Sequence, residues 1–102
     1  MSQRTPVTSS TQILERISSL KEVLHSHYTV ERIGLFGSFA RGEGRVESDV
    51  DLLVEFASET FDHYMDCKFL LEETLGRPVD LVLPTTLKPR LRDQIMHEVV
   101  YA

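Results

Sequence analysis

Residues 37–54, which read GSFARGEGRVESDVDLLV, decide the fold. The stretch opens on Gly37-Ser38 and passes through two further glycines. It ends in a run where acidic and apolar residues alternate. Side chains on a β-strand point to opposite faces in turn, so the alternation from Asp49 to Phe56 predicts a strand with one buried face and one carboxylate-bearing face. The glycines before it predict a turn-rich connection.

Upstream of this stretch, a helix and a strand are expected. Apolar residues recur at steps of three and four from Ile13 to Tyr28, which predicts an amphipathic helix. Ser9 and Gln12 match a capping box at its start. The short apolar run over 33–36 predicts a buried strand.

Downstream, the expected elements alternate in type: a helix over 61–75, a strand over 79–83, a helix that Pro89 opens, and a short closing strand over 99–101. In the last helix, Leu91 and Ile95 are expected to face inward. The order of elements predicts an α/β fold, a single small domain in which helices pack against a mixed β-sheet. We expect residues 1–10 to form a flexible N-terminal tail and residues 11–102 to form the domain.

Composition limits the class of protein. The chain has 102 residues and 11.7 kDa, with 41% hydrophobic and 26% charged residues, which is typical of one soluble globular domain. No apolar run approaches the roughly 18 residues of a membrane span, and the N-terminus lacks the apolar core of a signal peptide. The single cysteine, Cys67, excludes an internal disulfide and suits a reducing compartment. A cytoplasmic protein without membrane contact is expected.

The charge is acidic and unevenly spread. Sixteen Asp and Glu against 11 Lys and Arg give a net charge of −5, which argues against a protein that coats nucleic acid, so no direct DNA binding is expected. The segment 55–73 holds six acids and one base. We interpret its helix, with Glu72 and Glu73, as a candidate docking face for a basic partner.

Three aspartates form a candidate metal site. Asp49 and Asp51 share a strand face with Cα atoms about 6.6 Å apart. Carboxylates at that spacing can bridge two divalent cations about 3.5 to 4 Å apart, and oxygen ligands favour Mg²⁺ or Mn²⁺. Asp80, in the next expected strand, adds a third carboxylate if the two strands are neighbours. An Asp-x-Asp pair is also common at a solvated strand edge, so the apolar neighbours of these acids give the metal site its weight.

Gly37-Ser38 is a candidate phosphate cradle. Free N–H groups and a hydroxyl after a strand can hold phosphate oxygens, and glycine lets the backbone come close. Taken alone, a Gly-Ser pair after a strand is more often a plain turn. A Walker loop would need lysine at Glu43, a dinucleotide fingerprint lacks its third glycine, and a calcium loop from Asp49 has Leu53 at a ligand position.

These motifs resemble one family when taken together. Gly37-Ser38, ten intervening residues, Asp49-Val50-Asp51 and a distant Asp80 are similar to the signature of the DNA polymerase beta-like nucleotidyltransferase superfamily, whose fold is thereby implied. Residues 37–54 resemble the pattern of its minimal nucleotidyltransferases, and the resemblance covers about residues 12 to 101.

The resemblance implies roles for individual residues. Gly37 and Ser38 would contact the β- and γ-phosphates of a nucleotide. Asp49 and Asp51 would bind metal, and Asp80 would ligate metal and act as the base. Two further candidates for nucleotide binding are Arg41 and Ser48. For Arg41 and Arg45, phosphate neutralisation and a local ion pair remain equal alternatives.

The resemblance also implies a reaction and a partner. Larger relatives carry a helical domain that holds the acceptor, and minimal nucleotidyltransferases pair with a helical HEPN-type toxin. The implied function is Mg²⁺-dependent transfer of AMP from ATP to a hydroxyl of that toxin, with tyrosine the expected acceptor, as the antitoxin of a type VII toxin-antitoxin system. Two alternatives stay open: a binding module that neutralises a toxin without catalysis, and a transferase acting on a small molecule or an RNA end.

Overall fold

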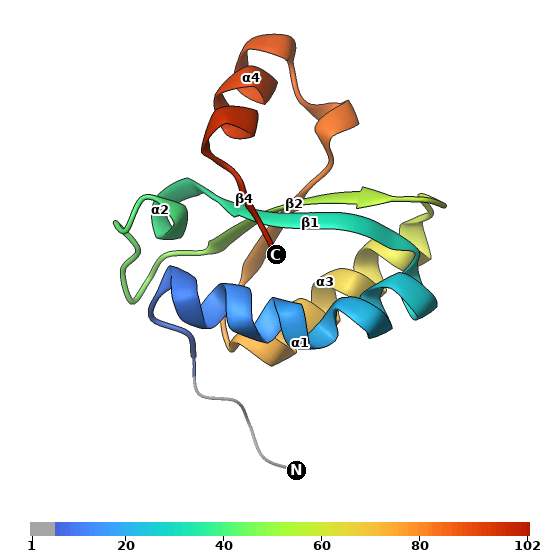
Figure 1. Ribbon diagram of the computed structural model, residues 1–102, viewed down its shortest axis with the longest axis horizontal. Coiled ribbons are helices and arrows are strands. Elements are labelled where there is room, and N and C mark those ends of the chain that lie inside the picture. The colour runs from blue at the N-terminus through green and yellow to red at the C-terminus, as the bar shows by residue number, and fades with distance from the viewer. Residues whose placement is uncertain (1–5) are drawn as a thin grey trace.

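The computed structural model describes residues 6–102, which form one small mixed sheet with helices on both faces (Figure 1). The elements follow the chain as α1 (Ser10–Tyr28), β1 (Val30–Phe36), α2 (Gly37–Ala40), β2 (Val50–Phe56), α3 (Phe61–Leu75), β3 (Val79–Val82), the 3-10 turn η1 (Pro84–Thr86), α4 (Pro89–Glu98) and β4 (Val100–Tyr101). The predicted α/β architecture is confirmed.

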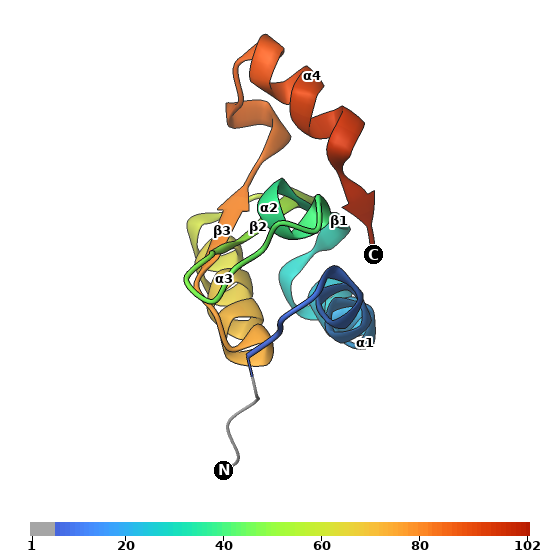
Figure 2. The same cartoon turned by 90° about the vertical axis from the view of Figure 1, so that its left-hand side faces the viewer.

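The sheet has the strand order β3-β2-β1-β4. Strands β1 and β2 are antiparallel, β2 and β3 are parallel, and β4 pairs antiparallel with β1. The parallel pair requires a crossover, which α3 provides. Helices α1 and α3 cover one face of the sheet, and α4 lies on the other (Figures 1 and 2).

Two apolar clusters hold these layers together. The larger lies between the sheet and the helices α1 and α3, and its fully buried members include Ile13, Ile17, Leu24, Leu35, Leu52, Val54, Cys67, Leu71 and Leu75. The smaller lies under α4 and consists of Phe36, Leu53 and Ile95. Leu53 is 1% exposed although it shares a strand face with the acids, so that face is partly covered by α4 rather than open to water.

The predicted cap of α1 is confirmed in a shifted form. The Ser9 hydroxyl accepts the Gln12 N–H at 3.2 Å, as a capping box requires. The Gln12 side chain reaches one residue further back, because its Oε1 accepts the N–H of Thr8 at 2.7 Å.

The predicted flexible tail over 1–10 was wrong in its last part. Residues 1–5 lie outside the described residues. Val7 is fully buried in the main cluster, and its N–H donates to the Leu75 carbonyl at 3.0 Å. The domain therefore extends at least to Val7, because one apolar side chain there completes the core beside the end of α3.

Strand ends and the α4 face also differ from expectation. Strand β1 begins at Val30 rather than Ile33, and β3 ends at Val82 rather than Leu83. Leu91 is 47% exposed, so the expectation that it faces inward was wrong, and only Ile95 of α4 is buried. Among residues 6–102, no helix is both long enough and apolar enough to cross a membrane.

Candidate active site

The paired strands β2 and β3 bring two of the predicted acids together. Asp51 and Asp80 are register partners in the parallel pair, and neighbouring strands lie about 4.8 Å apart. Asp49 lies one residue before β2. The three acids predicted from sequence therefore gather where β2 and β3 begin.

The end of β1 meets the same place. Because β1 runs antiparallel to β2, Phe36 is the register partner of Asp51, and Gly37 follows directly. Gly37 has a φ of +78°, and a Cβ built on it would lie 2.1 Å from Asp51 Oδ2. Only glycine fits this conformation and this close approach. The phosphate-cradle candidate and the metal-ligand candidate are thus in contact.

The carboxylates act on one another. The pKa of Asp51 is raised to about 6, chiefly by burial and to a lesser degree by the negative charges of Asp80 and Asp49. Asp49 and Asp80 themselves are exposed at the surface. Asp51 is therefore the inner acid, with a charged neighbour on each side.

The three aspartate carboxylates are suitable ligands for Mg²⁺, although their side chains do not converge on one point. Three carboxylates at the head of two neighbouring strands offer the oxygen ligands that Mg²⁺ prefers. Within residues 6–102, no group of three His, Cys, Asp or Glu side chains lies close enough to enclose an ion. Aspartate side chains rotate about two bonds, and Asp49 and Asp80 are exposed, so both are free to turn towards a cation at Asp51.

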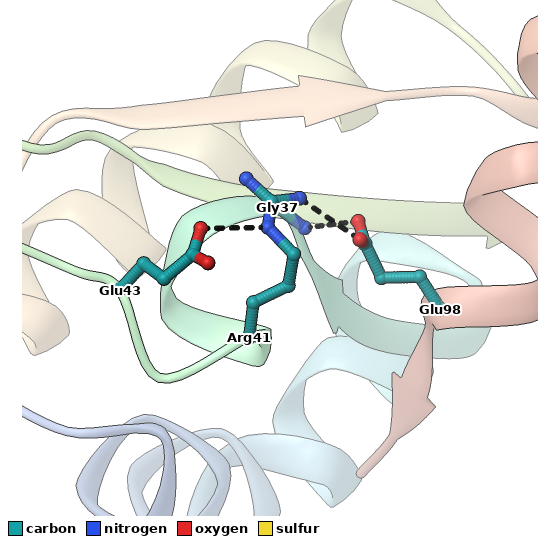
Figure 3. A network of polar contacts seen from close by, with 4 residues as sticks. All are labelled: Gly37, Arg41, Glu43 and Glu98. Atoms are coloured by element: carbon teal, nitrogen blue, oxygen red, sulfur yellow. Dashed lines mark hydrogen bonds and ion pairs between the residues drawn. The ribbon is translucent and has the colours of Figure 1, made fainter.

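Arg41 forms the local ion pairs that sequence reasoning left open. Its guanidinium contacts Glu98 Oε1 at 2.9 Å and Glu43 Oε1 at 3.0 Å (Figure 3). These two carboxylates raise the pKa of Arg41, so the side chain is a permanent cation. The other oxygen of Glu98 accepts the Gly37 N–H at 2.7 Å. Glu98 therefore joins α4 to the Gly37 turn.

The two candidate serines lie in different settings. Ser38 is half-buried directly after Gly37. The hydroxyl of Ser48 accepts a hydrogen bond from the Arg45 N–H at 2.9 Å, and the backbone N–H of Ser48 donates to the Arg45 carbonyl at 3.0 Å. Ser48 therefore shapes the loop that leads into Asp49, and a role in nucleotide binding stays a prediction.

Sequence reasoning missed two residues beside the site. Glu98 is 61 residues from Gly37 in the chain, and nothing in the spacing points to their contact. Arg77 donates to the carbonyls of Val7 and Val46, and its guanidinium lies 5.2 Å from the centre of the Phe39 ring. It thereby joins the N-terminal segment, the loop before Asp49 and α2.

A cavity of about 440 Å³ adjoins these groups. The polar part of its wall is formed by the Gly37 backbone and the side chains of Arg41, Asp80, Gln94 and Glu98, and the apolar part comes from the end of β1, from β3, from Leu87 and from α4. Of the three aspartates, Asp80 lines this cavity. This cavity therefore matches the size and polarity of a small-ligand site.

Comparison with known proteins agrees with this geometry. Residues 17–102 match the family model described as a nucleotidyltransferase domain. The chain belongs to this nucleotidyltransferase family. A protein adenylyltransferase, MntA, of Thermococcus cleftensis is 39% identical over 93 residues, which are 86% of this chain and 94% of the relative. A second relative, from Methanocaldococcus jannaschii, is 35% identical over 99 residues, with 86% of this chain and 99% of the relative covered.

Solved structures share the fold of this nucleotidyltransferase. One that is assigned to the minimal nucleotidyltransferases has a TM-score of 0.71 and 38% identity, over 85% of this chain and 93% of that chain. Another shows a tri-AMPylated Shewanella oneidensis HEPN toxin in complex with an MNT antitoxin, with a TM-score of 0.60 and 22% identity, over 88% and 70% of the two chains. The predicted family and fold are confirmed, and the protein is a nucleotidyltransferase.

Proposed function

We propose that this nucleotidyltransferase moves AMP from ATP to a hydroxyl, with tyrosine the expected acceptor, of a HEPN-class partner protein. It would thereby act as the antitoxin of a type VII toxin-antitoxin pair. The observation that carries the proposal is the register of Asp51 against Asp80 with Gly37 in contact. The adenylyltransferase name of its Thermococcus relative and the toxin complex of its fold neighbour support the choice of AMP and partner.

The chain's own donors would hold the nucleotide. The N–H of Gly37 and the guanidinium of Arg41 point at one place, and both can donate to phosphate oxygens. Charge-assisted bonds of this kind fix the triphosphate in one orientation. Two Mg²⁺ ions, held by Asp49, Asp51 and Asp80, would neutralise the triphosphate and stabilise the charge that develops during transfer.

Asp80 would act as the base for the acceptor hydroxyl. In the reaction, the acceptor oxygen forms a bond to the α-phosphorus, and the bond from that phosphorus to the bridging oxygen breaks. Pyrophosphate leaves with the electron pair, and Asp80 takes the hydroxyl proton. Asp80 is exposed at the surface, so a side chain of another protein can reach it without rearrangement of this one.

The test uses the complex of this protein with its HEPN-class partner. ATP labelled at the α-phosphorus and Mg²⁺ should label the partner, whereas γ-labelled ATP should not, because AMP rather than phosphate is transferred. Asp51→Asn should lower labelling by about 100-fold or more, since an inner carboxylate is lost. Asp93→Asn, the same change at an exposed position of α4, is the matched control and should label normally.

Two results would decide against the proposal. Labelling from γ-labelled ATP would indicate a kinase-like transfer. Absence of any label, in a folded complex that still binds ATP, would favour the alternative of a binding module.

A further inference from the structure

Glu98 places a carboxylate on the two donors that the proposed function assigns to phosphate. One oxygen accepts the Gly37 N–H at 2.7 Å, and the other contacts Arg41 at 2.9 Å (Figure 3). Both contacts are short and charge-assisted, which makes them strong. A carboxylate and a phosphate present oxygen acceptors of the same kind, so Glu98 occupies the position that a phosphate group would take.

The two acceptors exclude each other. A backbone N–H has a single hydrogen to donate, so Gly37 cannot give a full hydrogen bond to Glu98 and to a phosphate oxygen at once. The charges also oppose co-occupancy. Glu98 is one of the charges that raise the pKa of Asp51, so it lies close enough to add to the negative potential of the three aspartates.

Glu98 is held on these donors while no other anion competes. The Gly37 N–H and the Arg41 guanidinium together lower the pKa of Glu98, so its side chain stays ionised. Behind it the chain is fixed, because β4 pairs with Gly34 and Leu35. A Cβ at Gly34 would lie 2.6 Å from the Val99 side chain, so the backbone next to Glu98 packs directly on β1.

The side chain can leave without unfolding α4. Glu98 is the last residue of α4, its side chain is 26% exposed, and it borders the cavity of about 440 Å³. Rotation about its own side-chain bonds would carry the carboxylate off Gly37 while the backbone stays in place.

We infer that Glu98 is a built-in competitor for the phosphates of the nucleotide, and that nucleotide binds only when Glu98 leaves Gly37 and Arg41. This inference rests on the proposed function, because it concerns the same phosphate position. The apparent affinity for nucleotide is then the intrinsic affinity reduced by the fraction of molecules in which Glu98 has swung away.

The test compares the binding of ATP and of inorganic tripolyphosphate, each with Mg²⁺, to the full chain by calorimetry. Glu98→Gln and Glu98→Ala should both bind about tenfold tighter than the wild type. Glu43→Gln is the matched control, because it removes the other carboxylate on Arg41 but leaves Gly37 covered; it should change affinity by less than about twofold. Tripolyphosphate lacks the nucleoside, so a gain with it places the competition at the phosphates.

A second readout follows the Gly37 amide by NMR without nucleotide. Its proton resonance should lie far downfield in the wild type and move upfield in Glu98→Gln, since a charged acceptor is replaced by a neutral one. The same upfield shift should not occur in Glu43→Gln.

Each outcome decides. Tighter binding of ATP and of tripolyphosphate by the Glu98 variants supports the proposal that Glu98 competes with the phosphates. Unchanged or weaker binding, with a wild type that binds ATP, overturns it in favour of a clamp that positions Arg41, and leaves the proposed function intact. If neither the wild type nor either Glu98 variant binds ATP, the proposed function fails and the competitor fails with it.

Discussion

Asp51 lies half-buried between Asp80 and Asp49, where its charge is useful for binding cations and unfavourable for folding. Its pKa is raised to about 6 from an ordinary 3.8, chiefly by burial. Between about pH 4 and pH 6 the folded chain therefore binds more protons than the unfolded chain, and the free energy of unfolding falls as pH rises.

Asp51→Asn should stabilise the protein above pH 6. The shift corresponds to at most about 3 kcal/mol, and partial exposure of the group reduces this to about 1 kcal/mol. For a chain of this size the expected rise in Tm is about 4–8 °C at pH 7.5, without added divalent cations. At pH 4 the difference should be much smaller, because the Asp51 carboxyl of the folded wild type is then mostly protonated and carries little charge.

Thermal denaturation at the two pH values checks this, with Asp66→Asn as the control that should move Tm little at either. A lower or unchanged Tm of Asp51→Asn at pH 7.5 would mean that the ionised Asp51 carboxylate does not destabilise the fold.

Gly37 could be recognised as a special residue from its sequence context, and the structure adds the reason. Its positive φ and its contact with Asp51 leave no room for a side chain. The role of Arg41 could not be decided from sequence, because both of its alternatives need only a nearby anion. Its partner Glu98 becomes a neighbour only after α4 and β4 fold back onto β1.

At the scale of elements, two adjacent glutamates of α3 have different surroundings. Glu72 Oε2 accepts the N–H of Val79 at 2.9 Å, where β3 begins, whereas Glu73 is exposed. The expectation that both belong to a docking face was therefore wrong for Glu72, which ties α3 to β3. For the other exposed acids of this helix, a role in docking a basic partner stays a prediction.

Glu72→Ala should destabilise the fold by about 1–2 kcal/mol, because it leaves a part-buried backbone donor without its charged acceptor. Glu73→Ala, one residue on, should change the free energy of unfolding by less than about 0.5 kcal/mol. Urea denaturation of the two variants against the wild type measures both values. Equal losses would contradict the assignment of Glu72 to β3.

The helices and strands were predictable where the apolar pattern was regular, and their ends were not. Strand β1 starts three residues earlier than predicted. The prediction missed this start because the exposed charges of Glu31 and Arg32 interrupt the apolar run. Arg32 nonetheless pairs across the sheet with Glu55 at 3.6 Å. Leu91 follows helical spacing, but α4 buries only a narrow strip around Ile95. Periodicity alone does not reveal how wide a buried strip is.

At the scale of the whole molecule, Arg77 connects three segments that are distant in sequence. Its Nε donates to the Val7 carbonyl at 2.6 Å, a second nitrogen donates to the Val46 carbonyl, and the guanidinium faces Phe39. The planar fork of arginine makes these contacts at once, and a lysine ammonium cannot reproduce them.

Arg77→Lys should lower the free energy of unfolding by about 1–2 kcal/mol, although charge is conserved. It should also weaken Mg²⁺-ATP binding, because the loop before Asp49 loses its anchor. Arg92→Lys on the exposed surface of α4 is the matched control. Differential scanning calorimetry measures the loss of stability, and titration with ATP measures the loss of binding. If Arg77→Lys matched Arg92→Lys in both measurements, the role of Arg77 in connecting the three segments would be contradicted.

The overall fold could be predicted from one stretch because residues 37–54 carry both the strand and the site. Long-range contacts such as Gly37 with Glu98 and Val7 with Leu75 could not, since they depend on how the ends of the chain return to the sheet. The net charge of −5 likewise hides a local imbalance, because four of the six acids of 55–73 lie on α3.

Asp49, Asp51 and Asp80 are central to the proposed function, in which they form a two-cation nucleotide site. Electron paramagnetic resonance of Mn²⁺ tests it most directly, by counting the ions bound per chain with a non-hydrolysable ATP analogue present. We expect two ions for the wild type, and loss of at least one in Asp49→Asn and Asp51→Asn but not in Asp66→Asn. Two ions retained in both aspartate variants, or none bound by the wild type, would contradict it.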